Sequence, residues 1–239
     1  MLYVVSTPIG NLGDLSPRAA DALKSVDTVL AEDTRVTRKL LNHIDAHPKV
    51  ERFDDHTAYA KTPGIVDRII HGEKIGIVSD AGTPGISDPG QALIDAVLDA
   101  GEPSSLVTVI PGPSAVIGAL TASGLPADTF YFGGFLPRKP AQIKAELERL
   151  GFLDTSLIFY ESPKRIAKTL GILAEIMPDR RAAIIRELTK RYEEVTRATL
   201  AELAVVFGAR DSIKGEIVLV IAPVAVKKEP RVHVDKYGG

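Results

Sequence analysis

The sequence predicts a two-domain α/β protein. Its length of 239 residues suits two domains of about 100 to 150 residues each. Short apolar runs alternate with helical patterns through the first half, which predicts a mainly parallel sheet, because crossover helices join parallel strands. This rhythm changes after Pro126, and a mixed sheet is expected there. We therefore predict an N-terminal α/β domain over residues 1–113, a C-terminal α/β domain over 114–224 and a polar tail over 225–239.

The composition is that of a globular protein, with 45% apolar and 25% charged residues. The longest apolar run, from Ile217 to Val226, contains Pro223 and is shorter than the roughly 18 residues that a spanning helix needs. The N-terminus lacks a basic leader before an apolar core, so we expect a cytoplasmic protein outside the membrane. The absence of cysteine excludes disulfides, a thiolate nucleophile and a cysteine-ligated zinc site.

Charge is distributed unevenly along the chain. Residues 1–113 carry 10 Lys and Arg against 16 Asp and Glu, a net charge of −6, whereas residues 114–239 carry 19 against 15, a net charge of +4. A polyanion such as RNA would be drawn to the second half. Solvated helix faces would produce the same excess of positive charge, so the charge pattern alone does not decide between RNA binding and an ordinary charged surface.

The elements of the first half follow one another as strand, loop and helix. Ser16 is placed to cap the first helix, and Pro17 suits its first position. Strands are predicted at 2–6, 28–31, 50–53, 75–78 and 106–110. Helices are predicted after Ser16 and at 35–43, 65–70, 92–100 and 115–123.

The second half begins with an aromatic, glycine-rich strand and an amphipathic, charged helix. A strand near 194–198 is placed to pair antiparallel with its neighbours. Strands are predicted at 130–135, 156–160, 182–185, 194–198 and 217–221, with helices at 141–150 and from Arg165 to Met177. These elements complete the expected mixed sheet.

The stretch from Ile75 to Pro89, IGIVSDAGTPGISDP, predicts a strand, a rigid loop and a helix start. Gly82 and Gly85 allow positive φ and close approach of the backbone to a ligand, while two prolines stiffen the path. Asp80 would lie at the carboxyl end of its strand, where open α/β sheets bind their ligands. We interpret this loop as a ligand-binding loop.

Other strands also end in polar residues. Asp33 or Thr34 either lines a cleft or caps the following helix, and Ser114 either caps a helix or marks an anion-binding N-terminus. Together with the strand ends at 160–161, 186–190 and 214–216, these loops predict a cleft for a neutral-to-zwitterionic small molecule. The motifs GxGxxG, GxxxxGK[ST] and GxSxG are absent, and the five scattered histidines predict no metal site.

Seven strings in this chain carry a family resemblance: TPIGNLGDLSPRA, EDTRVTRKLL, VSDAGTPGISDPG, VIPGPSA, FGGFLPRK, IFYESPKR and RELTKRYEE. Together, over Leu2 to about Ile221, the chain resembles the ribosomal RNA small-subunit methyltransferase I family of the tetrapyrrole methylase superfamily. The resemblance implies a two-domain tetrapyrrole methylase-like (class III methyltransferase) fold, S-adenosylmethionine between the domains, and a homodimer. It also implies 2′-O-methylation of a cytidine ribose in the decoding region of 16S rRNA, in the 30S subunit.

The resemblance also assigns residues to the cofactor. The loop formed by Asp80, Ala81, Gly82 and Thr83 is the first expected contact with S-adenosylmethionine. The further cofactor contacts that the resemblance implies are Ile9, Ser114, Ala115, Tyr160, Leu188, Gly215 and Glu216. Many members carry a further helical C-terminal segment, whereas this sequence stops soon after its last predicted strand, which puts any RNA contact made by that segment in doubt.

Methyl transfer to a ribose hydroxyl benefits from a general base, because the hydroxyl is a poor nucleophile. The candidates are Lys190, whose pKa can fall beside Arg186 and Arg191, and the carboxylates of Glu187 and Glu216. Ion pairs that steady the loop, or phosphate contacts, are the alternative roles for these residues. RNA backbone contacts are expected from Arg138, Lys139, Lys164, Arg165 and Arg186.

Three other functions agree with the same residues. A tetrapyrrole or diphthamide-type methyltransferase would share the cofactor cleft but needs a deep acceptor pocket. A non-catalytic protein that binds S-adenosylmethionine as a sensor would retain the cleft alone. A ribosome assembly protein would bind the small subunit without depending on the cofactor loop.

Overall fold

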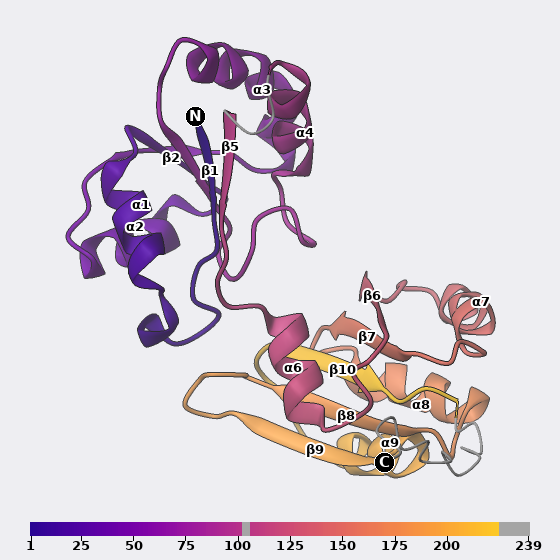
Figure 1. The fold of residues 1–239 in the computed structure, drawn as a ribbon. Helices are drawn as coiled ribbons and strands as arrows, with labels where there is room; N and C mark the ends of the chain where they lie inside the picture. The colour runs from indigo at the N-terminus through magenta and orange to yellow at the C-terminus, as the bar shows by residue number, and fades with distance from the viewer. Residues whose placement is uncertain (102–105, 225–239) are drawn as a thin grey trace, which may run out of the picture. The chain divides into compact units, whose positions relative to one another are not determined.

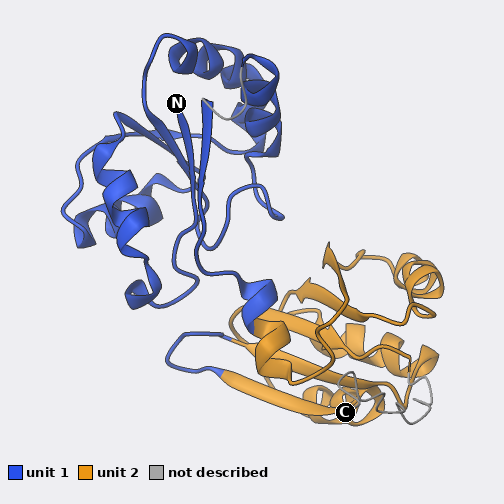
Figure 2. Ribbon diagram, viewed as in Figure 1, with its two compact units in different colours: residues 1–118, 187–193 blue, residues 119–186, 194–239 orange. Residues whose placement is uncertain are grey.

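The structure is a computed structural model that describes residues 1–101 and 106–224, so the predicted tail 225–239 lies outside the described residues. The chain forms two compact units (Figure 2). Unit 1 comprises residues 1–118 together with 187–193, and unit 2 comprises 119–186 and the chain from Glu194 onward. This division falls after Gly118, a few residues beyond the predicted domain boundary at Pro113, and it assigns a short segment of the second half to unit 1.

Unit 1 contains a parallel five-stranded sheet in the order β3-β2-β4-β1-β5. Figure 1 labels its strands β1, β2 and β5. Its strands are β1 (Leu2–Val5), β2 (Thr28–Ala31), β3 (Lys49–Arg52), β4 (Ile75–Val78) and β5 (Val107–Ile110). Its helices are the 3-10 helix η1 (Leu12–Asp14), α1 (Pro17–Ser25), α2 (Thr34–His43), α3 (Asp55–Ile70), α4 (Gln91–Asp99) and the first part of α6 (Ala115–Ser123). The mainly parallel first sheet is therefore confirmed.

Both faces of the three central strands of this sheet, β2, β4 and β1, are buried. Val29 packs in one apolar cluster with Leu23 of α1 and Leu40 of α2. Leu30, the next residue along β2, packs in the other cluster with Ile69 of α3 and Leu93 of α4. Successive strand residues point to opposite faces, so β2 is apolar on both sides, as strands of covered parallel sheets are.

Local sequence determines where the helices begin. The Ser16 side chain accepts a hydrogen bond from Ala19 N at 3.1 Å, and Pro17 occupies the first turn of α1, as predicted. Helix α3 begins well before the predicted start near Ile65, because Asp54 and Thr57 form a reciprocal capping box. Pro63 lies inside this helix.

Unit 2 contains a mixed five-stranded sheet in the order β6-β7-β10-β8-β9. The β6 strand runs parallel to β7, whereas β10 runs antiparallel to both of its neighbours, β7 and β8, and β9 runs antiparallel to β8. The strands are β6 (Phe130–Phe135), β7 (Ser156–Glu161), β8 (Arg181–Arg186), β9 (Glu194–Thr199) and β10 (Ile217–Ile221). The predicted mixed sheet of the second half is confirmed.

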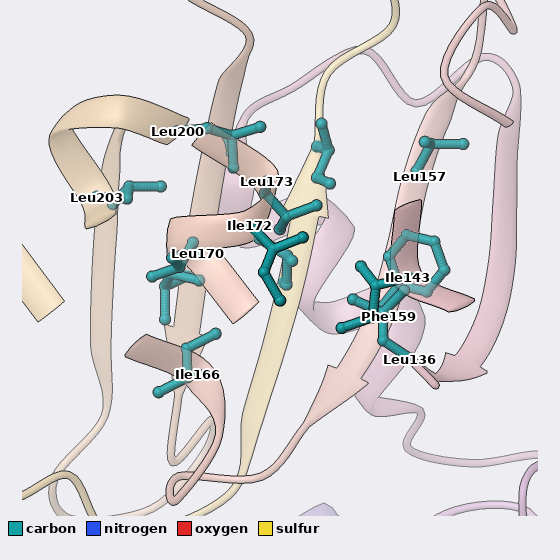
Figure 3. Packing of buried hydrophobic residues seen from close by; sticks show 14 of the residues in the cluster. Leu136, Ile143, Leu157, Phe159, Ile166, Leu170, Ile172, Leu173, Leu200 and Leu203 are labelled. Carbon is teal, nitrogen blue, oxygen red and sulfur yellow. The ribbon is translucent and has the colours of Figure 1, made fainter. Parts of the chain in front are cut away.

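Three helices of unit 2 share one apolar core with a single face of this sheet. These helices are α7 (Pro140–Leu150), α8 (Ile166–Ile176) and α9 (Leu200–Gly208). Phe159 of β7 and Leu219 of β10 are fully buried in this core. Figure 3 labels Phe159 together with Ile143, Leu173 and Leu203 of the same core. The neighbouring residue Tyr160 therefore points to the other face of the sheet.

Candidate cofactor-binding site in unit 1

The loop that follows β4 is fastened to the exit of β1. Thr7 N donates to Gly82 O at 2.8 Å, and Gly82 N donates to Thr7 O at 3.1 Å. The Thr7 hydroxyl donates to Ser79 O at 3.2 Å, and the hydroxyls of Ser6 and Thr83 share a hydrogen bond of 2.9 Å. These contacts fix the shape of the loop 80–83.

The turn after β5 lies against the same place. A Cβ atom added to Gly112 would lie 2.9 Å from Ser6 Cβ, and one added to Gly82 would lie 3.8 Å from Pro113 O. Gly82 has φ of +86°, a conformation that favours glycine. Because β4, β1 and β5 are neighbours in the sheet, the loops at their carboxyl ends converge.

The predicted contacts in this region therefore come together within unit 1. Ile9 and Gly82 are buried and Asp80 is exposed, whereas Ala81, Thr83, Ser114 and Ala115 are half-buried. Helix α6 begins at Ala115, and Ser114 O accepts its first intrahelical hydrogen bond, from Gly118 N at 2.9 Å. The first N–H groups of α6 have no carbonyl acceptor one turn earlier, so they suit an anionic group. The predicted residues brought together here are Ile9, Asp80, Ala81, Gly82, Thr83, Ser114 and Ala115.

Several carboxylates lie at this end of the sheet. Asp80 Oδ1 accepts a hydrogen bond from Asp33 N at 3.1 Å, while Asp33 caps α2 and binds Arg35. The hydrogen bonds from Arg35 lower the pKa of Asp33. The structure thus shows that Asp33, one of the two residues proposed as a cap, performs this role.

Two acids in this group have raised pKa values. Burial, followed by the charges of Asp80 and Asp55, raises the pKa of Asp88 to about 6, although a hydrogen bond with Ser79 opposes the shift. Burial, and then Asp80 and Asp88, raises the pKa of Glu32. Sequence reasoning did not single out Asp88, although it lies within the Ile75–Pro89 stretch. Carboxylates that repel one another in this way favour a cationic ligand.

Residues 187–193 complete unit 1. Leu188 packs on α6, since a Cβ atom added to Gly118 would lie 2.9 Å from Leu188 Cδ2. A Cβ atom added to Gly10, in the turn after Ile9, would lie 2.9 Å from Thr189 Oγ1. The predicted cofactor residue Leu188 therefore shares a unit with the glycine-rich loop.

The backbone of this segment is strained. Glu187 and Thr189 have φ values of +52° and +66°, which non-glycine residues rarely adopt. Such strain is concentrated at functional sites, where the surrounding structure holds it in place. The Thr189 hydroxyl oxygen is buried and has no hydrogen-bond partner within the described chain.

The candidate bases Lys190 and Glu187 form an ion pair with each other. Lys190 Nζ lies 3.0 Å from Glu187 Oε1, and both side chains are mostly buried. The third candidate, Glu216, is exposed and belongs to unit 2. Arg186, expected beside Lys190, makes ion-pair and hydrogen-bond contacts in unit 2, with Glu194 at 2.9 Å and Lys214 O at 3.1 Å.

The remaining predicted residues lie in unit 2. Tyr160 is the second-last residue of β7, and Gly215, with φ of +91°, lies just before β10. The side chains of the predicted RNA contacts Arg138, Lys139 and Lys164 are exposed.

Arg165 differs from these three cations. Its Nη2 donates to Leu136 O at 2.9 Å and to Pro137 O at 2.7 Å, and it lies 3.2 Å from the buried carboxylate of Glu161. This side chain therefore stabilises the turn after β6.

Within the described residues, no helix is long and apolar enough to cross a bilayer. The same residues contain no group of three or more His, Cys, Asp or Glu side chains arranged to hold a metal ion.

Comparisons with known proteins place these loops in a family. The family model of the tetrapyrrole (corrin/porphyrin) methylases matches residues 1–204. Ribosomal RNA small subunit methyltransferase I of Mesorhizobium japonicum is 44% identical over 236 residues, covering 98% of this chain and 79% of that protein. The protein of the same name from Halalkalibacterium halodurans is 45% identical over 229 residues, covering 96% of this chain and 78% of that protein.

A solved structure supports the fold. Uroporphyrin-III C-methyl transferase from Thermus thermophilus, complexed with S-adenyl homocysteine, matches with a TM-score of 0.62 at 17% identity. The match covers 92% of this chain and 96% of that chain. At this identity the likeness establishes a shared fold, with two α/β parts as predicted.

Proposed function

Because the chain belongs to the tetrapyrrole methylase family and, within it, to the ribosomal RNA small subunit methyltransferases I, we propose that it methylates the 2′-oxygen of a cytidine ribose in the decoding region of 16S rRNA. The chain is a methyltransferase of ribosomal RNA, and S-adenosylmethionine is its methyl donor. Identity above 40% to these relatives over nearly the whole chain is the observation that carries this proposal.

The residues of unit 1 fit this methyl donor. S-adenosylmethionine carries a sulfonium and an ammonium group, which suit the carboxylates of Asp80, Asp88 and Glu32. Its carboxylate suits the N-terminus of α6, and its adenosine suits half-buried loops in which glycine allows close backbone approach. We propose that the residues listed above hold it, with Leu188 beside α6 and with Tyr160, Gly215 and Glu216 from unit 2.

When bound, S-adenosylmethionine supplies an electrophilic methyl group, and the protein must align the ribose oxygen with it. We propose that the loop 80–83 places the donor and that the fixed contacts of Thr7 with Gly82 keep the loop in position before binding. Glu187, Lys190 and Glu216 are the proposed proton acceptors for the hydroxyl. Within this pair the Glu187 carboxylate can accept the hydroxyl proton directly, with Lys190 as its electrostatic partner, whereas Lys190 can accept it only as a neutral amine, after it has lost a proton.

The substrate and assembly follow from the same family membership. We propose that the 30S subunit is the form of the RNA that is methylated, that the chain acts as a homodimer, and that it acts in the cytoplasm. Net charge of +4 over residues 114–239 supports RNA recognition by unit 2.

Mapping ribose methylation in 16S rRNA tests the proposal. We expect a single 2′-O-methylcytidine in the decoding region in cells that carry the protein, and its absence when the gene is deleted. Purified protein should restore it on unmethylated 30S subunits. An unmodified ribose in both strains, or methyl transfer to a porphyrinogen or to diphthamide precursor instead, would overturn it. Cofactor retention without any methyl transfer would favour a sensor or an assembly protein.

A further inference from the structure

The edge strand of the second sheet contains a bulge that re-aims one aromatic side chain. Phe132 pairs with Ile158 and Phe135 pairs with Tyr160, so three steps along β6 match two steps along β7. Residues three apart in a regular strand point to opposite faces, whereas one extra residue brings both phenylalanines to the same face.

Glycine is required for this bulge. A Cβ atom added to Gly133 would lie 2.5 Å from Phe159 Cε1 and 2.9 Å from Tyr131 Cε1. Gly134 has φ of +62°, which glycine adopts without strain. The GG pair of the FGGF string therefore sets the direction of Phe135.

The result is a rigid aromatic cluster with one exposed member. Phe132 and Phe135 both meet the Tyr160 ring edge to face, at centroid distances of 5.0 Å and 5.6 Å. Phe135 is nevertheless 59% exposed. An exposed phenylalanine held by a neighbouring ring presents a stacking surface that is already ordered in the folded chain, so it loses little conformational entropy when a ligand binds.

Exposed basic residues lie in the two turns at the sheet edge where β6 ends with Phe135. The exposed Arg138 and Lys139 follow Phe135 in the turn after β6, and the exposed Lys164 follows the end of β7. The two strands run parallel, so these turns lie at the same edge of the sheet. Arg165 joins them, through its hydrogen bonds to Leu136 O and Pro137 O.

We propose that Phe135 stacks on an unpaired nucleobase of RNA while Arg138, Lys139 and Lys164 bind the flanking phosphates. Single-stranded RNA is recognised in this way, by base stacking on aromatic rings beside a positively charged surface. The proposal rests on the proposed function, because it names residues that bind the ribosomal RNA substrate. A protein partner would have less use for three exposed cations at the sheet edge that carries this ring.

Binding of a fluorescein-labelled oligocytidylate to the full chain, measured by anisotropy, tests the proposal without depending on methylation. Phe135→Ala should weaken binding about 5- to 100-fold, the effect of losing one base stack. Phe135→Trp should restore it. Phe152→Ala is the matched control, because Phe152 is 72% exposed in the same unit but lies in the loop before β7 and outside the turns that follow β6 and β7; it should leave binding unchanged.

Salt dependence separates the ring from the cations. Phe135→Ala should leave unchanged the slope of the logarithm of the association constant against the logarithm of the salt concentration. Neutralising Arg138, Lys139 and Lys164 together should make this negative slope shallower by about 2. An RNA duplex of the same length should show no Phe135 effect, because its bases are already stacked. Failure of the wild-type chain to bind the oligocytidylate, or equal effects of Phe135→Ala and Phe152→Ala, would refute the proposal. A Phe135 effect without ribosomal methylation would uphold it while the proposed function fails.

Discussion

Thr7 and Gly82 exchange two backbone hydrogen bonds, one in each direction, and so fasten the loop after β4 to the exit of β1. These residues are 75 positions apart in the sequence, yet their strands are neighbours in the sheet. A loop held in this way loses little conformational freedom when a ligand binds, which improves affinity.

The glycine in this pair should be difficult to replace. Gly82→Ala places a side chain at φ of +86°, which costs about 1 to 2 kcal/mol, although the space beside Ile9 admits a methyl group. We expect a lower urea midpoint and weaker S-adenosylmethionine binding. Gly64→Ala is the control: it lies within α3 with no atom within 4 Å of the added carbon, and should stabilise the chain by about 0.5 to 1 kcal/mol. Equal destabilisation by both changes would contradict this account.

Asp80 should contribute charge to cofactor binding. Asp80→Ala should raise the dissociation constant of S-adenosylmethionine, measured by calorimetry, about tenfold or more, because a charged contact is lost. Asp80→Asn keeps an oxygen for Asp33 N and isolates the effect of charge. The exposed Asp95 of α4 provides the control Asp95→Ala. An unchanged constant in Asp80→Ala removes this residue from the site.

Asp88 should make stability depend on pH. Its pKa is raised from 3.8 to about 6 in the folded chain, so the folded state binds more protons than the unfolded state between these values. Stability therefore decreases as pH rises through this window. Asp88→Asn should be more stable than wild type at about pH 7 by on the order of 1 kcal/mol, after allowance for solvent screening, and equally stable below about pH 4.

Urea unfolding across this pH range measures the Asp88 effect. Asp99→Asn, in the exposed end of α4, is the control and should show no difference that changes with pH. Because Asp88 also raises the pKa of Glu32, the wild-type curve should be broader than a single titration. Parallel curves for wild type and Asp88→Asn would show that Asp88 titrates normally.

The candidate bases are distinguished by single-turnover methylation of 30S subunits. Loss of a general base should slow methyl transfer by about 10² to 10⁴-fold and remove one limb of the pH profile. We expect this from Lys190→Ala or Glu187→Gln, which interrupt the 3.0 Å ion pair, or from Glu216→Gln. Unchanged rates and pH profiles in all three variants would exclude a side-chain base.

The sequence was most informative where one local signal dominates. Ser16 followed by Pro17 marks a helix start without tertiary help, and Ile75 to Val78 is apolar on both faces as a buried parallel strand must be. Helix α9 was not predicted, because its residues are apolar nearly all round and give no clear helical period. Its capping box of Thr199 and Glu202 was a signal that could have revealed it.

The candidate site was predictable in part for the same reason. Asp80 and Gly82 follow a strand that is easily recognised, so their place at its carboxyl end could be inferred. The raised pKa of Asp88 depends on burial and on acids from other segments of the chain. The positive φ of Thr189 could not be inferred from the sequence, because threonine rarely adopts it. Such properties arise only when distant parts of the chain meet.

The membership of residues 187–193 in unit 1 has a consequence for how the protein is made. During translation, most of residues 1–118 emerge from the ribosome before Leu188, which packs beside Gly118, has been synthesised. The N-terminal unit therefore emerges with an unfilled surface and reaches its full set of contacts only after most of unit 2 has been translated. A truncated chain that stops at Gly118 has the glycine-rich loop but lacks residues 187–193, which pack against Gly10 and Gly118.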